Sequence, residues 1–156
     1  MEASVLQFWR EYVDGLPARQ PRPEMPAHVF AFGDSKELAD ELAELVRTGT
    51  KTATCSALWS YEEEQKPLPQ KGELSIVIDG NGVPFAVIET DEVFIAPFNE
   101  VSEHFAYEEG EGDRSLAYWR EVHRNFFRRQ QFKDRSFNEE MALVCKRFRI
   151  LQVAAT

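Results

Sequence analysis

A short turn between two strand-forming segments restricts the fold of this chain more than any other feature of its sequence. Residues 74–78 (Leu-Ser-Ile-Val-Ile) and 83–90 are rich in β-branched and aromatic side chains, and Asp79-Gly80-Asn81-Gly82 separates them. Asp, Asn and Gly readily adopt the backbone angles of tight hairpin turns. The sequence therefore predicts an antiparallel hairpin, whose second strand continues through residues 93–95 to Pro97.

Helical periodicity surrounds this hairpin. Apolar residues recur at intervals of three and four in segments 5–16, 38–46 and 116–127, and segment 99–108 also has a helical composition. Candidate caps fit these boundaries: Asp34, Asn99 and Ser115 can accept hydrogen bonds at helix starts, and Gly49 can follow a helix end. Each of these segments is expected to bury one face.

Three more segments favour strands, namely 28–32, 51–58 and 143–153. Because strands and helices alternate without a regular βαβ rhythm, the pattern predicts an α+β fold with a small curved sheet or barrel flanked by helices. We expect two parts: an N-terminal helix with a connector over 1–27, in which four prolines lie between residues 17 and 26, and a main domain over 28–156.

The charge of the chain is unevenly distributed. The net charge is −9, yet residues 1–113 hold 8 basic and 23 acidic side chains, whereas residues 114–149 hold 10 basic and 4 acidic ones. The acidic total argues against binding to long duplex nucleic acid or to a membrane surface by bulk charge attraction.

The sequence also favours a cytoplasmic location. It has no apolar run long enough for a membrane span, and no basic region followed by a hydrophobic stretch at Met1. Cys55 and Cys145 lie far apart in apolar contexts. We therefore expect buried free thiols rather than a disulfide or a metal knuckle.

Lys51 is the first candidate for chemistry. It begins a segment of small, uncharged residues, where desolvation would lower its pKa and allow the amine to act as a base. The alternative is a lysine that extends from the preceding helix end into water. In a regular strand Thr52 and Thr54 share one face and Lys51 lies on the other, so a Lys51–Thr54 pair needs a turn or bulge.

Two charged clusters leave alternatives open. The loop 108–113 contains four carboxylates, which can bind a divalent cation or share a proton, or can simply be solvated. Arg120, Arg124 and Arg128 form a stripe that can bind phosphates or pair with acidic residues of the same chain. His123 shares the helix side of Trp119 and Phe126, so a hydrogen-bonded core histidine is expected. His28 and His104 have no partner at metal-ligand spacing, which argues against a zinc site.

An ordered series of motifs resembles the ASCH domain family over residues 28–151. The matching residues are Phe32-Gly33-Asp34, Leu38 to Leu42, Gly49 to Thr54, Trp59, Gly72-Glu73-Leu74, Glu89-Thr90, Glu109 to Leu116, Tyr118-Trp119 and His123. The resemblance implies a PUA-like fold, a small β-barrel flanked by helices. It also implies a cleft whose expected partner is a small-molecule nucleoside or single-stranded RNA. Many members have Glu and Arg after the Gly-x-Lys motif, where this chain has Thr54 and Ser56.

At this segment the chain resembles the bacterial members that hydrolyse N4-acetylcytidine. The resemblance implies catalytic roles for Lys51, Thr54 and Glu109, with Glu108 as a substitute for Glu109, and needs no metal or other cofactor. In this scheme Lys51 takes the hydroxyl proton of Thr54, which attacks the acetyl carbonyl. The residues expected to bind the substrate are Asp34, Thr52, Trp59, Arg114, Trp119, Arg120 and His123.

The resemblance leaves two other functions open. Some small members are described as metal-dependent ribonucleases, which would suit the acidic loop and the arginine stripe. Other PUA-like domains only bind RNA. The N-terminal helix with Trp9 could also form contacts between copies of the chain.

Overall fold

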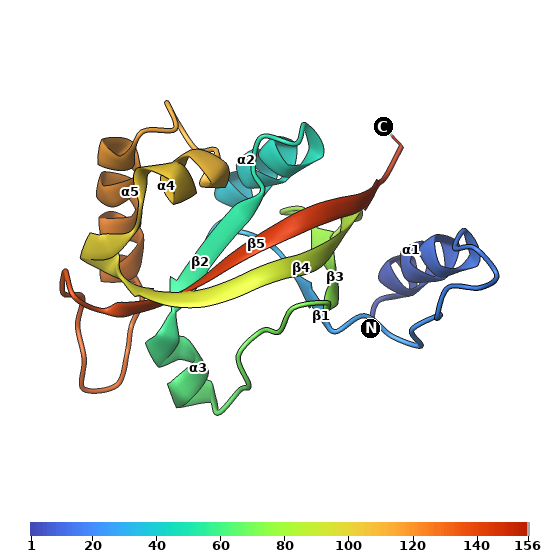
Figure 1. Cartoon of the computed structure of the whole chain (residues 1–156), viewed down its shortest axis with the longest axis horizontal. Coiled ribbons are helices and arrows are strands. Elements are labelled where there is room, and N and C mark those ends of the chain that lie inside the picture. The colour runs from blue at the N-terminus through green and yellow to red at the C-terminus, as the bar shows by residue number, and fades with distance from the viewer. Residues whose placement is uncertain (156) are drawn as a thin grey trace.

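The molecule is built around a curled five-stranded sheet (Figure 1). The computed structural model describes residues 1–155. Its strands follow the order β1-β3-β4-β5-β2. The strands are β1 (His28–Phe30), β2 (Ala53–Ala57), β3 (Leu74–Ile78), β4 (Pro84–Pro97) and β5 (Ala142–Val153). β1 pairs with β3 in parallel, and the other pairings are antiparallel. The sheet forms a half-barrel, because β1 and β2 are its edges and do not pair with each other.

Five α-helices and one short 3-10 helix complete the described chain. They are α1 (Ala3–Asp14), α2 (Lys36–Arg47), α3 (Leu58–Glu64), η1 (Phe98–Glu100), α4 (Glu103–Glu109) and α5 (Leu116–Arg129). The α+β prediction and the hairpin are confirmed, since β3 and β4 are antiparallel and are joined by the predicted turn. No helix among residues 1–155 is both long enough and apolar enough to cross a membrane.

Local chemistry explains most helix boundaries. Ser115 accepts a hydrogen bond from Tyr118 N, as predicted, and Gly49 follows α2 with a φ of 78°. Two predicted caps are wrong by one to three residues. Ser35 rather than Asp34 caps α2, and Ser102 rather than Asn99 caps α4, because Asn99 lies in η1 instead.

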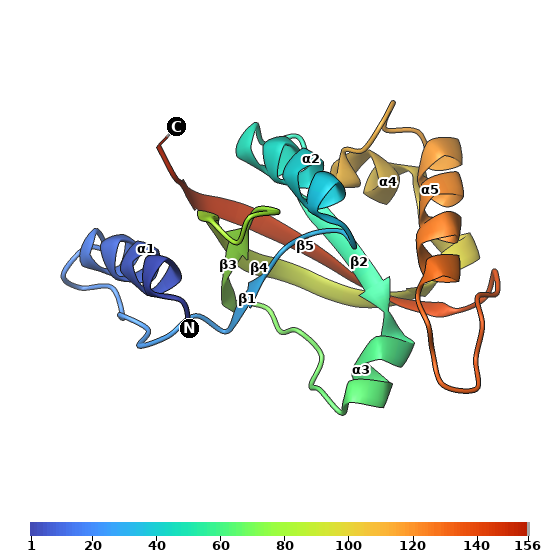
Figure 2. The ribbon, with the colours of Figure 1, turned by 180° about the vertical axis from the view of Figure 1, so that it is seen from behind.

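The core consists of three clusters on the two faces of the sheet. α4 and α5 pack over one end of the sheet through Phe105 and Trp119, and α2 covers another part through Leu42 and Val46 (Figures 1 and 2). α1 packs through Trp9, which is 1% exposed, and its neighbours against Ile76 and Val87 of β3 and β4. The apolar face of α1 is therefore covered within the chain.

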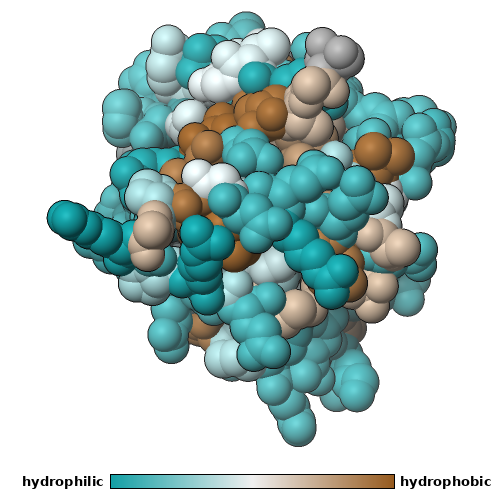
Figure 3. Space-filling model, turned by 90° about the vertical axis from the view of Figure 1, so that its right-hand side faces the viewer, coloured by the Kyte–Doolittle hydropathy of each residue, from teal (hydrophilic) through white to brown (hydrophobic). Residues whose placement is uncertain are grey.

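The surface around α1 is mainly hydrophilic. Figure 3 shows apolar side chains there only as separate patches among polar ones. The connector after α1 contains no helix or strand, and Trp9 fixes it by donating its indole N–H to the carbonyl of Glu24 at 3.1 Å.

Candidate functional site

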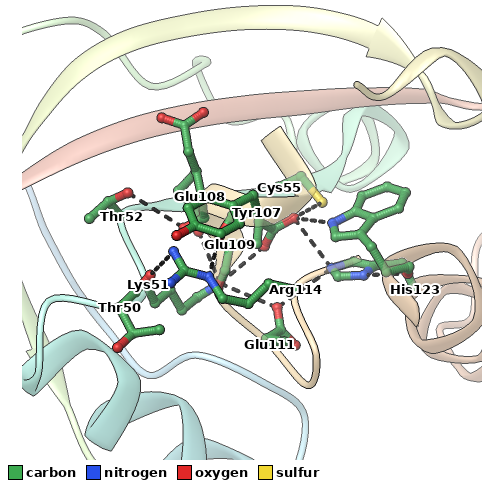
Figure 4. A network of polar contacts seen from close by, with 12 residues as sticks. Thr50, Lys51, Thr52, Cys55, Tyr107, Glu108, Glu109, Glu111, Arg114 and His123 are labelled. Carbon is green, nitrogen blue, oxygen red and sulfur yellow. Dashed lines mark hydrogen bonds and ion pairs between the residues drawn. The ribbon is translucent and has the colours of Figure 1, made fainter. Parts of the chain in front are cut away.

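A buried ion pair between Lys51 and Glu109 joins the start of β2 to the end of α4. Both side chains are 1% exposed, and Lys51 Nζ lies 3.0 Å from Glu109 Oε1 (Figure 4). The ammonium also donates to the carbonyl of Ala53 at 2.9 Å and lies 3.4 Å from Glu111 Oε2. Its donors are therefore directed at oxygens within the chain, rather than at water.

Backbone contacts hold this junction together. Gly110 ends α4 with a φ of 77°, and a Cβ atom there would lie 2.6 Å from the carbonyl oxygen of Thr50. Thr52 N donates to the carbonyl of Glu108 at 2.8 Å. Only glycine permits both the left-handed angle and the close approach that place Glu109 beside Lys51.

The second carboxylate oxygen of Glu109 is surrounded by donors. Trp119 Nε1 donates to Oε2 at 2.6 Å, Cys55 Sγ lies 3.3 Å from it and His123 Nε2 lies 3.4 Å from it (Figure 4). Burial raises the pKa of Glu109, but Lys51 and His123 lower it by more, so its pKa lies well below the usual range. Glu109 is ionised at neutral pH.

Lys51 is an ammonium, and the prediction of a base with a lowered pKa is wrong. Burial by itself lowers the pKa of Lys51, but the negative charges of Glu109 and Glu111 outweigh it and raise the pKa. The alternative of a lysine extending into water is wrong as well, because the side chain is buried. The net pKa of a buried lysine is lowered only where no nearby carboxylate outweighs the desolvation.

His123 completes this charged cluster from α5. Its ring stacks on Trp119 with centroids 4.2 Å apart, and Nδ1 lies 2.9 Å from the Trp119 carbonyl, which can only accept a hydrogen bond. Burial lowers the pKa of His123, but Glu109 raises it by more. The expected hydrogen-bonded core histidine is confirmed, and its two nitrogens both face acceptors, as in an imidazolium.

The acidic loop divides between structural pairs. Glu109 rather than Glu108 faces Lys51, because the Glu108 side chain accepts from Arg147 Nε at 2.8 Å. Asp113 accepts from Ser115 N at 2.9 Å. The loop is therefore not simply solvated.

Thr54 lies on a different side of β2, where it lines an open cleft of about 470 Å³. The cleft lies between the two edges of the half-barrel and is lined by His28 to Gly33, Thr54, Cys55, Ser56, Tyr61, Lys66, Pro67, Pro69, Phe126, Val144 and Lys146. Phe32 lines the cleft and also lies beside the ion pair, since Lys51 Nζ is 5.3 Å from the centre of that ring. Within residues 1–155 no hydrogen bond joins Lys51 to Thr54.

Several residues predicted to bind substrate do not line this cleft. Asp34 pairs with Arg129 at 3.0 Å, Trp59 packs edge-on against Phe132, and Arg120 donates to the carbonyl of Asn99 at 3.2 Å. Other members of the arginine stripe also have partners within the chain, as in the Arg124–Glu139 pair at 2.9 Å.

Thr52 and Arg114 stabilise the backbone around the ion pair instead. Arg114 donates to the carbonyls of Tyr107 and Thr50, and Thr52 binds the carbonyl of Glu108 (Figure 4). Their placement suits the junction between α4 and β2 rather than direct contact with a ligand in the cleft.

Sequence reasoning named Glu111 only as one carboxylate of the acidic loop, and it did not place Cys55 or Lys146 in the site. Cys55 lines the cleft, but its thiol points to Glu109: its Sγ, one Glu109 oxygen and one His123 nitrogen lie within 4.8 Å of one another, close enough to hold a metal ion. The sequence separation of these three residues gave no metal motif. The Lys51 ammonium, 3.0 Å from Glu109, opposes a second cation there.

The half-barrel, the helices over its ends and the open cleft define an α+β domain of the PUA-like class. A family model of the ASCH domain matches residues 28–152, and the chain belongs to the ASCH domain family. No curated protein matches the chain.

Solved structures agree with this assignment. The chain is similar to the ASCH domain from Lactobacillus crispatus JV V101, with 34% identity over 97% of this chain and 96% of that one and a TM-score of 0.90. It is also similar to a protein from Enterococcus faecalis V583, with 38% identity, 98% and 91% coverage and a TM-score of 0.82. The ASCH protein from Zymomonas mobilis, with 12% identity, 81% and 68% coverage and a TM-score of 0.52, shares the fold alone.

Proposed function

We propose that this ASCH protein hydrolyses the acyl amide of N4-acetylcytidine-type compounds in the cleft of the half-barrel. The observation that supports this most is the buried Lys51–Glu109 ion pair directly behind the strand that presents Thr54 to the cleft. Phe30, Phe32 and Tyr61 line the same cleft and offer aromatic surface to a nucleobase.

The proposed reaction has two balanced steps. Thr54 Oγ forms a bond to the acetyl carbon, the carbon–nitrogen bond breaks, and the hydroxyl proton ends on the departing amine of cytosine. Water then hydrolyses the threonine ester to acetate and free Thr54. In this scheme Lys51 gives one ammonium proton to the departing amine and takes the hydroxyl proton of Thr54 in exchange, while the ionised Glu109, 3.0 Å from Lys51 Nζ, holds the ammonium in place.

This scheme requires a change on ligand binding. Lys51 is an ammonium that makes no hydrogen bond to Thr54 in the described structure, so it must come into contact with the hydroxyl and must give up a proton before it can take one. Binding must bring Thr54 and the ion pair within hydrogen-bond reach, directly or through one water.

Release of acetate from N4-acetylcytidine tests the proposal. We expect wild-type protein to release acetate and Thr54→Val to reduce the rate by about 100-fold or more, since the variant lacks the nucleophile. Thr48→Val is the matched control, because Thr48 is exposed at the end of α2 and away from the cleft. No release by the wild type, or full release by the Thr54 variant, would contradict the mechanism.

A metal-dependent ribonuclease is the second candidate, because Cys55, Glu109 and His123 converge closely enough for a metal ion, which would have to displace the Lys51 ammonium from Glu109. It predicts cleavage of single-stranded RNA that depends on Mg²⁺ or Mn²⁺ and stops with a chelator. RNA binding without either product would support a binding module.

A further inference from the structure

The molecule contains two buried lysines with opposite surroundings. Lys51 is 1% exposed and has four oxygen contacts within 3.4 Å. Lys146 on β5 is 9% exposed, and no hydrogen bond or ion pair reaches its ammonium from any other residue of the described range 1–155. The side chain is largely buried and its ammonium opens only into the cleft, so Lys146 has no counter-charge from the chain in the free protein.

The Lys146 side chain extends into the cleft. On β5 Lys146 pairs in register with Thr54 of β2, and its Nζ lies 4.9 Å from the centre of the Phe30 ring on β1, the opposite edge strand. Lys146, Thr54 and Phe30 all line the cleft of about 470 Å³. The charged end therefore lies toward β1, while the threonine is on β2.

The charge of the cleft is opposite to that of the whole chain. None of the chain's 27 Asp and Glu residues is among its lining residues, although the net charge is −9. Glu73, the acidic residue that acts most on Lys146, has partners of its own in His28 at 3.5 Å and the Gln70 backbone N–H at 2.6 Å. Burial lowers the pKa of Lys146 to about 8, so most molecules carry the ammonium at neutral pH.

From this arrangement we infer that the cleft binds an anionic ligand, a mononucleotide whose phosphate pairs with Lys146, rather than a neutral nucleoside. The inference rests on the proposed use of this cleft as the ligand site. The phosphate supplies the counter-charge that Lys146 lacks, and Phe30 and Phe32 supply apolar surface for the rest of the molecule.

Calorimetric titration of the full chain tests the inference with four ligands: cytidine 5′-monophosphate, cytidine, inorganic phosphate and a cytidine trinucleotide without terminal phosphate. Wild-type protein should bind the monophosphate roughly 10- to 100-fold more tightly than cytidine, the range for one buried charge-assisted contact. Lys146→Met should remove this preference. Lys36→Met is the matched control, because Lys36 is exposed on α2 and does not line the cleft, and it should keep the preference.

Each outcome decides the inference. Equal binding of cytidine and its monophosphate, no binding of either, or a preference that survives in Lys146→Met would overturn it. Tighter binding of the trinucleotide than of the monophosphate would overturn the choice of a mononucleotide. Binding of inorganic phosphate by wild-type protein but not by Lys146→Met would support the anion site independently of the nucleoside part. Failure to release acetate would refute the proposed hydrolysis but would leave a Lys146-dependent preference standing.

Discussion

Removing the charge of Glu109 tests the buried ion pair most directly. Glu109→Gln keeps the size of the side chain but leaves the buried Lys51 ammonium with Glu111, 3.4 Å away, as its one remaining carboxylate among residues 1–155. The new NH₂ group also cannot accept from the donors that now surround Oε2. Breaking a fully buried ion pair from one side costs about 3–5 kcal/mol. Both partners are 1% exposed, so we expect a loss in this range in the free energy of unfolding.

A double-mutant cycle separates the pair from the loss of each side chain. Lys51→Met should also destabilise the protein, because it leaves the Glu109 carboxylate without its ammonium. The double variant has no charge in either position, so its cost should be at least about 2 kcal/mol smaller than the sum of the two single costs.

Urea unfolding followed by tryptophan fluorescence and circular dichroism measures all four proteins. Trp119 donates directly to Glu109, so its emission also reports the local change. Glu62→Gln is the control, since Glu62 pairs with Arg135 at 3.1 Å on the surface and should cost less than about 1 kcal/mol. A cost below about 1 kcal/mol for Glu109→Gln, or single costs that add within about 0.5 kcal/mol, would refute the reasoning.

Two further predictions follow from the pKa shifts. Glu109 has a lowered pKa and stabilises the fold above its unfolded pKa, whereas His123 has a raised pKa and stabilises it below about 6.5. The free energy of unfolding, measured with urea, should therefore fall when the pH drops below about 4.5 and when it rises above about 6.5. His123→Gln should reduce the fall above pH 6.5, and the same pH dependence in the variant and the wild type would contradict the assignment to His123. Burial raises the pKa of the Cys145 thiol to about 12 and that of the Cys55 thiol well above its usual value. A thiol reagent at pH 8 should therefore label the native protein roughly 1000-fold more slowly than the urea-unfolded chain. Equal labelling rates would contradict the raised pKa values.

Local sequence signals predicted most of the fold. The turn at 79–82, the cap at Ser115 and the stop at Gly49 depend on chemistry within a few residues, and the structure contains all three. α3 was missed for the same reason. It begins directly after β2 at Leu58, its N-cap Ala57 supplies no side-chain hydrogen bond, and none of its residues is buried, so neither a cap nor an apolar periodicity marks it.

The candidate site was only partly predictable. The motifs that resemble the family named Lys51 and Glu109, but their charge states depend on a contact across 58 residues that no local pattern shows. Lys146 could have been found from the sequence, because Val144 and Phe148 lie two residues to either side of it and share its face of the strand. A lysine between two apolar residues at strand spacing indicates a buried amine.

The ion pair also bears on how β2 finds its place in the sheet. The alignment of a strand is normally fixed by the contrast between its apolar face and its polar face. This contrast is weak in β2, because small residues occupy both faces, as in Ala53, Thr54 and Cys55. A slip of one residue against β5 would turn Lys51 toward the cleft and leave Glu109 among Trp119 and His123 without its ammonium. The cost of that stranded carboxylate penalises the slipped pairing, so one pair of charges selects the native alignment of a strand whose own side chains hardly distinguish it.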